Sequence, residues 1–301
     1  MNFREFIVRV PATTANLGPA FDCIGMALGI YNDVVIKSSD RFILSVEGSG
    51  LEDLPKDKTN LIAKAFFRVY SEIGVKAPDV EIQCTNRIPI ARGLGSSAAA
   101  IVSGLKAANH LSKCQLSTSE LLDLAVEMEG HADNVASALL GGVQIAITDG
   151  SKTTTSLVDI PDDLRVVIFI PALTISTEKA RNMLPPNIAL ADAVFNVGRA
   201  ALLVNALASG RLEDLSRGTE DKMHQPYRQP LFPAAKLIMR EALMAEALGV
   251  FVSGSGPTIV ALVKEHEMSV VYRMAEAARK ANISGDTRII DIISVGAHIL
   301  S

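Results

Sequence analysis

Residues 89–99, which read P-I-A-R-G-L-G-S-S-A-A, form the stretch best suited to chemistry. Gly93 and Gly95 allow a tight turn and let the backbone approach a ligand without a Cβ in the way. A helix expected to begin at Ser96 would aim its free N–H groups and the positive end of its dipole at this loop, a geometry that binds phosphate. Ser96 and Ser97 add hydroxyls that can cap the helix, contact phosphate or coordinate Mg²⁺. The candidate phosphate-binding residues are Pro89, Ile90, Ala91, Arg92, Gly93, Leu94, Gly95, Ser96, Ser97, Ala98 and Ala99.

Two familiar phosphate-loop patterns fit this stretch poorly. The Walker pattern needs a lysine after its second glycine, and Ser96 stands there instead. The dinucleotide pattern G-x-G-x-x-[GA] is matched by Gly93, Gly95 and Ala98. However, Glu120, the acidic residue at about the required spacing, falls inside an expected helix. A dinucleotide loop and an ordinary glycine turn with a serine N-cap remain as alternatives.

Two further polar stretches hold candidate ligands. Residues 11–22, P-A-T-T-A-N-L-G-P-A-F-D, follow an expected strand and present Asn16 and Asp22, two side chains that could bind an amine. The alternative is a loop built on Asx-turns. Residues 252–258, V-S-G-S-G-P-T, lie between two expected strands. They form either a hairpin turn or a glycine-rich approach to the phosphate-binding loop.

The elements that must position these residues can be predicted for the first 150 residues. Runs rich in β-branched or alternating residues predict strands at 6–10, 33–37, 42–46, 80–84 and 143–147. Helices are expected at 60–73, with Asn60 as N-cap and Gly74 at its end, and at 96–111. Ser117 and Glu120 form a capping box that opens a helix reaching about residue 128. A polar interruption at 129–134 then precedes a short apolar helix.

A Gly/Ser/Thr-rich stretch at 149–156 suggests a soft domain boundary. Beyond it, strands are expected at 164–170, 250–253, 258–263 and 288–295. Three helices are expected: one at 189–208, one that ends near residue 249, and one at about 268–281. Without the extra helix this order is β-α-β-β-α-β, which is typical of ferredoxin-like domains.

The composition excludes several classes of protein. The chain has 301 residues, is 49% hydrophobic and 21% charged, and carries a formal net charge of −4. It lacks the basic cluster that nucleic acid or an anionic membrane surface would require, so neither partner is expected. Its three cysteines are widely spaced and form no C-x-x-C pair, which disfavours a zinc site or a disulfide framework. The first residues do not resemble a signal peptide, and strongly apolar runs such as 166–173 are too short to span a bilayer, so a cytoplasmic protein is expected.

Four motifs in a fixed order resemble those of the galactokinase, homoserine kinase, mevalonate kinase and phosphomevalonate kinase superfamily. P-x-x-x-G-L-G-S-S-A at 89–98 resembles its nucleotide loop, and S-G-S-G-P-T at 253–258 resembles its C-terminal motif. Residues 11–22 and E-G-H-A-D-N-V-A at 129–136 are most similar to the homoserine kinases within it. The departures are Ala20 for a glycine, Cys23 for a serine and Ala132 for a frequent proline, and none of them removes a charge.

The resemblance implies an α+β fold, with a ribosomal-S5-like N-terminal domain at 1–155 and a ferredoxin-like C-terminal domain at 156–301. It implies ATP in the cleft between them and phosphorylation of the side-chain hydroxyl of L-homoserine, a step of threonine biosynthesis. Mg²⁺ would be held by Ser97 and Glu129, with Ser96 and Glu127 as alternatives. Either a monomer or a homodimer is compatible with the sequence.

The resemblance also assigns the substrate end. Asn16 and Asp22 would face the amine and hydroxyl, while His131 and Asn134 would line the same pocket. Arg181 and Arg228 look like a clamp for the substrate carboxylate, since guanidinium groups match carboxylate geometry. Thr177 lies one helical turn before Arg181. The candidate catalytic residues are Asn134, Asp22, Thr177 and Arg181.

Related kinases place an aspartate beside the attacking hydroxyl, and Asn134 stands at the matching position. An amide is a poor proton acceptor, so catalysis by positioning and charge stabilisation is expected. Asp133 and Asp22 remain candidate bases. Two other functions stay open: another kinase or decarboxylase of the mevalonate branch, and a non-catalytic small-molecule sensor.

Overall fold

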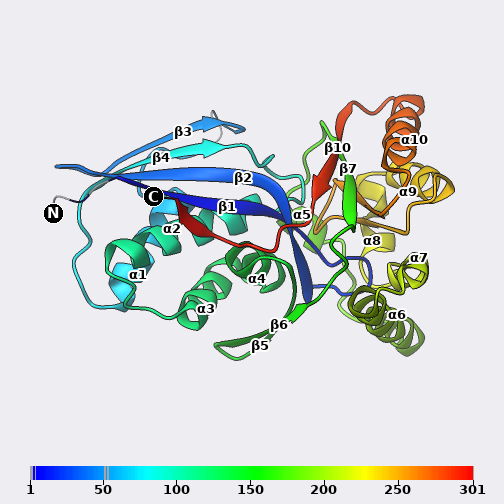
Figure 1. The fold of residues 1–301 in the computed structure, drawn as a ribbon, viewed down its shortest axis with the longest axis horizontal. Helices are drawn as coiled ribbons and strands as arrows, with labels where there is room; N and C mark the ends of the chain where they lie inside the picture. Colours follow the sequence, from blue (N-terminus) through cyan, green and yellow to red (C-terminus); the bar gives the residue numbers. More distant parts are fainter. Residues whose placement is uncertain (1–2, 4, 51, 53, 301) are drawn as a thin grey trace.

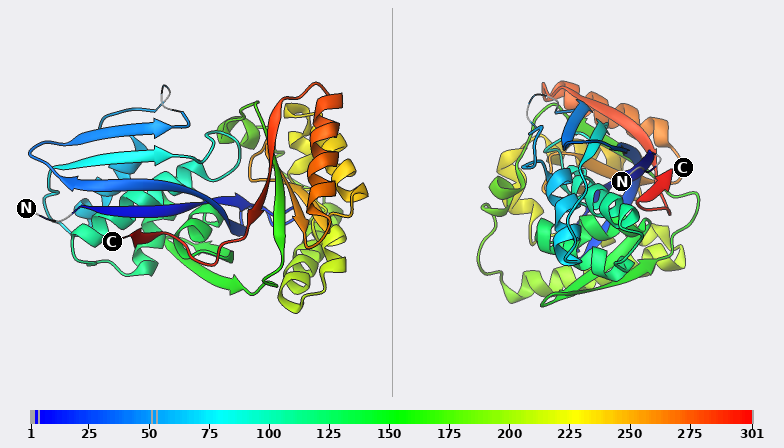
Figure 2. Two further views of the ribbon diagram at one scale, coloured as in Figure 1. Left: turned by 45° about the horizontal axis from the view of Figure 1, so that its top comes forward. Right: turned by 90° about the vertical axis from the view of Figure 1, so that its left-hand side faces the viewer.

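The computed structural model describes residues 3, 5–50, 52 and 54–300. Within them the chain forms two β-sheets, which lie toward opposite ends of the long axis and are each packed against helices (Figure 1). The last strand returns from the C-terminal half to the N-terminal sheet, as Figure 2 shows.

The N-terminal sheet has seven strands among the described residues. Its main path runs β11-β1-β2-β4-β3, while β5 pairs with both β2 and β6. The long β2 pairs with β5 through its first residues and with β4 through its last, so it joins the two parts of the sheet. The strands are β1 (Phe6–Ala15), β2 (Ile24–Ser38), β3 (Ile43–Gly48), β4 (Val80–Asn86), β5 (Val143–Asp149), β6 (Lys152–Val158) and β11 (His298–Leu300).

Four helices cover one face of this sheet: α1 (Leu61–Glu72), α2 (Ser96–Leu111), α3 (Thr118–Glu129) and α4 (Asp133–Leu140) (Figure 1). Asn60 caps α1 by accepting a hydrogen bond from the Ile62 N–H, and Ser117 with Glu120 forms the expected capping box of α3. Gly104 lets α2 pack tightly on α1, because a Cβ there would overlap the Ile62 carbonyl oxygen. The sheet and these helices enclose the main hydrophobic core.

The second sheet is antiparallel, with the order β10-β7-β9-β8. It consists of β7 (Arg165–Pro171), β8 (Gly249–Val252), β9 (Ile259–Val263) and β10 (Gly285–Asp291), and α9 (Ala235–Met244) and α10 (Glu267–Lys280) pack against it. Numbered along the chain, this order is 4-1-3-2, as expected for a split β-α-β unit. The expected α+β fold class is therefore confirmed.

The connection from β7 to α9 contains the remaining helices: α5 (Thr177–Arg181), α6 (Leu190–Ser209), η1 (Leu212–Asp214), α7 (Leu215–Gly218), α8 (Gln225–Arg228) and η2 (Gln229–Leu231). By length and composition alone, α6 could cross a membrane, which the shorter apolar runs considered above did not indicate. Yet α6 packs against α7, and its Asp192 and Arg199 form ion pairs with Lys222 and Glu220.

The stretch 149–156, taken from sequence as a boundary, mostly belongs to β6, which pairs with β5 along its whole length. The domain division expected at 155/156 thus falls inside this strand. The chain passes to the second sheet between β6 and β7.

Candidate active site

A cavity of about 540 Å³ is lined by residues of both halves of the chain. The N-terminal half contributes the loop before α2, Asn16, Asp22 and the junction of α3 with α4 at residues 129–134. The C-terminal half contributes α5, Arg228 and the turn between β8 and β9. The cavity thus brings together all four motifs identified in the sequence. The predicted residues that line it are Asn16, Asp22, Pro89, Ile90, Ala91, Arg92, Gly93, Leu94, Gly95, Ser96, Ser97, Glu129, His131, Asp133, Asn134, Thr177, Arg181 and Arg228.

Residues 89–95, called the nucleotide loop from here on, pass close to other backbone segments. Gly93 and Gly95 both have positive φ, at 73° and 66°. A Cβ on Gly93 would overlap the carbonyl oxygen of Ser253, and one on Gly95 would overlap Thr13 Oγ1. The loop can therefore reach both the β8–β9 turn and β1 only with glycine at these positions.

The N-terminus of α2 faces this cavity without a side-chain cap. Gly95 is its N-cap, and no acidic residue lies in its first turn. The first N–H groups of this 16-residue helix are therefore free to donate hydrogen bonds to an anion, and the helix dipole favours an anion there. Of the predicted phosphate-binding residues, Ala98 and Ala99 are fully buried behind this end.

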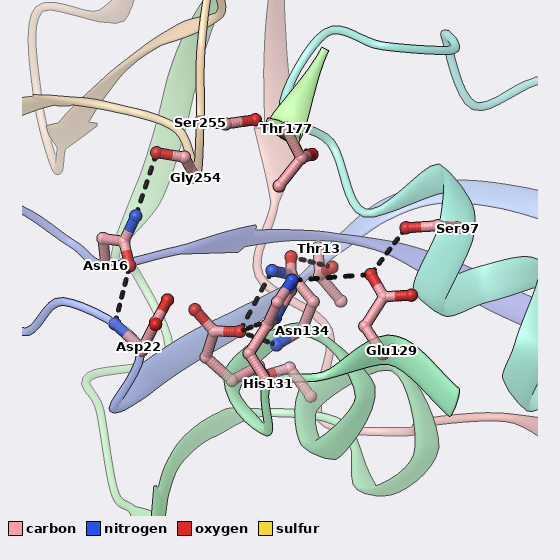
Figure 3. Close-up of polar contacts among 12 residues, drawn as sticks. Thr13, Asn16, Asp22, Ser97, Glu129, His131, Asn134, Thr177, Gly254 and Ser255 are labelled. Atoms are coloured by element: carbon pink, nitrogen blue, oxygen red, sulfur yellow. Dashed lines mark hydrogen bonds and ion pairs between the residues drawn. The ribbon is translucent and has the colours of Figure 1, made fainter. Parts of the chain in front are cut away.

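A hydroxyl and a carboxylate meet beside the helix end. Ser97 Oγ donates a hydrogen bond of 2.5 Å to Glu129 Oε1, as Figure 3 shows. Burial raises the pKa of Glu129, although the bond from Ser97 and the charge of His131 counteract it. Glu127, the alternative carboxylate, instead pairs with Arg68 at 3.0 Å. Ser96 lines the cavity, but only Ser97 bonds to Glu129.

Residues 16–22, called the substrate loop from here on, present Asp22 to the C-terminal half. Asn16 orients this loop: its Oδ1 accepts from the Asp22 N–H at 2.9 Å, and its Nδ2 donates to the Gly254 carbonyl at 2.9 Å (Figure 3). Asp22 forms a bidentate pair with Arg181 at 2.8 and 2.9 Å. Burial alone would lower the pKa of Arg181, but its hydrogen bonds to Asp22 leave it raised.

Arg228 is 6% exposed and forms no ion pair with any carboxylate of the described residues. It donates through Nε to the Ala180 carbonyl, and through Nη1 to the Gly254 carbonyl and to His224 Nδ1. Burial and the nearby charge of Arg181 lower the pKa of Arg228 to about 10. A buried cation without a counter-ion at a cavity wall favours an anionic ligand.

His131, between α3 and α4, and the first two residues of α4, Asp133 and Asn134, form a network of polar side chains. Asp133 Oδ1 accepts from His131 Nδ1 at 2.8 Å and from the Asn134 N–H and Nδ2 at 2.7 and 3.2 Å. Asn134 Oδ1 in turn accepts from Thr13 Oγ1 at 2.8 Å (Figure 3). Burial would lower the pKa of His131, but the bond to Asp133 and the nearby carboxylates outweigh it and raise the pKa.

Sequence reasoning missed several residues of this cavity. Ser255 lines the cavity, and its Oγ lies 3.4 Å from Thr177 Oγ1, but it is not among the predicted site residues (Figure 3). Thr13, which bonds to the cavity residue Asn134, is not among them either. The capping role found for Asn60 could have pointed to the region ahead of α1. That end of the cavity is mainly apolar, and it is lined by Val46, Leu54, Pro55, Thr59, Asn60, Leu61, Ile62, Lys64 and Ile90.

Family models match both halves of the chain. Residues 60–142 match the GHMP kinases N terminal domain, and residues 203–281 match the GHMP kinases C terminal. This chain belongs to the GHMP kinase family. The resemblance predicted from its motifs is confirmed, and membership in this family implies ATP use.

Relatives that match nearly the whole chain support this family membership. The chain is 41% identical over 294 residues to a protein named homoserine kinase from Desulfitobacterium hafniense, covering 97% of this chain and 99% of that one. It is 42% identical to another of that name from Moorella thermoacetica, covering 98% and 99%. A solved homoserine kinase structure from Cytophaga hutchinsonii matches with a TM-score of 0.90 at 30% identity, covering all of both chains. A mevalonate kinase from L. major shares the fold, with a TM-score of 0.72 at 16% identity.

Proposed function

We propose that this GHMP kinase transfers the γ-phosphoryl group of ATP to the side-chain hydroxyl of L-homoserine, giving O-phospho-L-homoserine for threonine biosynthesis. The observation that carries the proposal is the convergence of Asp22 with Arg181 and Arg228 at one cavity wall. A carboxylate and two guanidinium groups suit the ammonium and carboxylate of an amino acid. Relatives named homoserine kinase at about 40% identity and nearly full length support the same substrate.

The nucleotide loop and the free end of α2 would bind the triphosphate. Uncapped N–H groups and the helix dipole stabilise phosphate oxygens. Of the predicted residues, Gly93 and Gly95 let the backbone come close, and Ser96 and Ser97 add hydroxyl donors. The apolar end of the cavity, lined by residues such as Leu54 and Ile62, would hold the base.

Ser97 and Glu129 would hold Mg²⁺ next to the phosphates. No three His, Cys, Asp or Glu side chains of the described residues gather as a complete metal site. Mg²⁺ fits this, because it usually binds through one or two protein oxygens with phosphates and water as its other ligands. When bound, the ion would neutralise charge on the transferring phosphoryl group. The Glu129 side chain is only 9% exposed, and among the described residues its one ion-pair partner is His131 at 3.8 Å, so a cation would stabilise its ionised form.

The substrate would break the ion pair between Asp22 and Arg181 and provide a new partner for each of them. Its ammonium would bind Asp22, held in place by Asn16, while its carboxylate would bind Arg181 and Arg228. Its hydroxyl would then lie near Asn134 and Thr177, which can only position it. Asp133 is engaged with His131 and Asn134 through Oδ1, and Asp22 would be engaged with the substrate ammonium. We propose that no general base operates and that alignment and charge stabilisation carry the reaction.

An assay of ATP consumption tests the proposal. Purified protein with Mg-ATP is given L-homoserine, L-threonine, L-serine or mevalonate in separate reactions. We expect the highest turnover with homoserine and very little with mevalonate, which has no ammonium group for Asp22. Turnover of mevalonate without turnover of homoserine would refute the proposed substrate, and no turnover of any acceptor would favour a sensor.

We also propose that the enzyme works in the cytoplasm. Its cysteines, Cys23, Cys84 and Cys114, are free thiols, which suits a reducing compartment.

Sedimentation at micromolar concentration distinguishes a monomer from the homodimer considered above.

A further inference from the structure

His224 lies fully buried directly behind the substrate pocket, between Arg228 and the substrate loop. Its Nε2 is 2.7 Å from the Gly18 carbonyl oxygen, and its Nδ1 is 3.1 Å from Arg228 Nη1. The ring of Phe21 lies 5.3 Å from the ring of His224 and also faces the guanidinium of Arg228. His224 therefore contacts both the loop that carries Asp22 and Arg228, an arginine that lines the cavity.

These two contacts fix the protonation state of His224. A guanidinium N–H can only donate, so Nδ1 must carry a lone pair, and a carbonyl oxygen can only accept, so Nε2 must carry the proton. A second proton on Nδ1 would point at the Arg228 N–H and add a positive charge beside it. Burial lowers the pKa of His224, in agreement with a neutral ring.

The direction in which Arg228 points depends on these contacts. Of its five N–H groups, three are used: one on the Ala180 carbonyl, one on the Gly254 carbonyl and one on His224 Nδ1. Among the described residues none accepts a hydrogen bond from Nη2, and Arg228 lines the cavity. Fixing Nε and Nη1 leaves the two Nη2 hydrogens for a ligand, because the guanidinium is planar.

The substrate loop is also fixed by direct contacts. Gly18 has a φ of 90°, and a Cβ there would overlap the Thr219 carbonyl oxygen, so this turn packs directly on the segment before α8. Asn196 donates to the Pro19 carbonyl and to Asp221 Oδ1. A movement of His224 would therefore shift both Arg228 and the substrate loop.

We propose that His224 is a positioning residue: its neutral Nε2–H form holds Arg228 toward the substrate carboxylate and ties it to the substrate loop. This inference rests on the proposed function, because Arg228 is taken to bind the carboxylate. His224 itself is walled off from the cavity and would touch no substrate. Its effect should therefore fall on homoserine binding rather than on the chemical step.

Two isosteric substitutions separate the two contacts. The amide of asparagine can place an acceptor near the position of Nδ1, and that of glutamine can place a donor near the position of Nε2. We expect His224→Phe to raise KM for homoserine about tenfold, with KM for ATP and kcat within about twofold, as for the loss of one hydrogen bond to a charged group. His224→Asn should recover most of this loss, because it can still accept from Arg228, whereas His224→Gln should recover little.

His266→Asn is the matched control, because His266 is an exposed histidine that pairs with Glu246 outside the cavity. It should leave both KM values unchanged. Equal defects in His224→Asn and His224→Gln, or a parallel rise in KM for ATP, would reduce His224 to a structural role and overturn the proposal. An unchanged KM for homoserine in His224→Phe would overturn it as well.

The pH dependence gives a second readout. The charged groups that face His224 are Asp221, Asp22 and Arg228. Asp221 Oδ2 lies 3.5 Å from Nε2 and favours protonation, while burial and Arg228 oppose it. Since the pKa is lowered, protonation occurs only below its usual value near 6.5. KM for homoserine should therefore rise as pH falls below that value in the wild type, and this rise should be weaker in His224→Asn.

A measurement without substrate separates this inference from the proposed function. Long-range ¹H–¹⁵N spectra of the intact protein report the tautomer of each of its five histidines, and loss of one signal in His224→Asn assigns His224. We expect the neutral Nε2–H form at pH 7. An Nδ1–H form or an imidazolium would overturn the inference even if homoserine is phosphorylated. A wild type that turns over no homoserine would instead refute the proposed function alone.

Discussion

In the proposed binding mode Asn134 lies near the acceptor hydroxyl, where a carboxylate would be able to act as a base. Its Oδ1 accepts from Thr13 and its Nδ2 donates to Asp133, so both ends of the amide are used. In Asn134→Asp the Nδ2 donor becomes an oxygen facing Asp133, and two close carboxylates raise the pKa of one of them. We expect a folded protein whose kcat stays within about threefold of the wild type or falls, because phosphoryl transfer gains little from an added base. A large gain in kcat with a new acidic limb in the pH profile would contradict this.

Ser97 and Glu129 should matter for turnover more than for stability. Their side chains bond mainly to each other beside α2, so removing either leaves few buried groups unsatisfied. We expect Ser97→Ala and Glu129→Ala to lower kcat by about 100-fold or more, in the range for lost charge stabilisation, with Tm changed little. Glu127→Ala is the control, since Glu127 pairs with Arg68 on the surface. Near-normal activity of both variants at saturating Mg-ATP would rule out this metal site.

Arg181 and Arg228 should affect homoserine selectively. Each would give charge-assisted hydrogen bonds of about 1.5–3 kcal/mol, so an alanine at either position should raise KM for homoserine roughly 10- to 150-fold. KM for ATP should change little, since the nucleotide loop lies in the other half of the chain. Lysine variants should also be defective, because a point charge cannot reproduce a planar fork. Equal losses for both ligands would indicate misfolding, and no loss would exclude the carboxylate clamp.

The sequence predicted which residues line the site better than it predicted their contacts. Motif resemblance brought Asn16, Asp22 and Arg181 together, and the cavity is lined by all three. It could not predict that Asp22 pairs with Arg181, since 159 residues separate them in sequence. His224 was missed because a single histidine carries no spacing signal. Its role depends on the backbone carbonyl of Gly18, which is not specified by a side chain.

At the scale of elements, local signals predicted the bounds of the long helices better than those of the strands, whereas the short helices α5, α7 and α8 were not predicted. Caps and periodicity predicted the bounds of α1, α2 and α6 to within a residue or two. The first half of β2 was missed, since it contains Gly25, which lets α4 approach so closely that a Cβ would overlap the Asp133 carbonyl oxygen. The polar, largely exposed β6 was read as a boundary because only its pairing with β5 makes it a strand.

The junction between the nucleotide loop and α2 allows a paired test of glycine. Gly95→Ala would place a Cβ against Thr13 Oγ1 at a positive φ, so we expect a loss of stability of about 1–3 kcal/mol and weaker ATP binding. Gly198→Ala in α6 meets nothing within 4 Å and should stabilise the protein by about 0.5–1 kcal/mol. Thermal unfolding of both variants measures the change in stability, and KM for ATP measures the change in ATP binding. A Gly95→Ala protein as stable as the wild type would show that the loop has room to move.

At the scale of the whole molecule, the pair between Asp22 and Arg181 links the N-terminal half to the C-terminal half across the cavity. Both side chains are about one-third exposed, at 33% and 36%, so in the free protein the pair contributes little, about 1 kcal/mol or less. A ligand with both an ammonium and a carboxylate can replace both partners at once. A ligand with only one of these charges must break the pair and leave one partner without a counter-charge.

This exchange predicts that, among homoserine and its two singly charged analogues, only the zwitterion stabilises the protein. L-Homoserine at 100 times its Kd should add about 2.7 kcal/mol to the free energy of unfolding, seen as a rise in Tm. At the same concentration, 4-hydroxybutyrate, which lacks the ammonium, and 3-aminopropanol, which lacks the carboxylate, should give almost no rise. In Asp22→Ala, 4-hydroxybutyrate should approach homoserine in effect, because Arg181 then has no internal partner to lose. Equal shifts for all three compounds on the wild type would show that the pair is not exchanged, and that the halves are held together by other contacts when substrate binds.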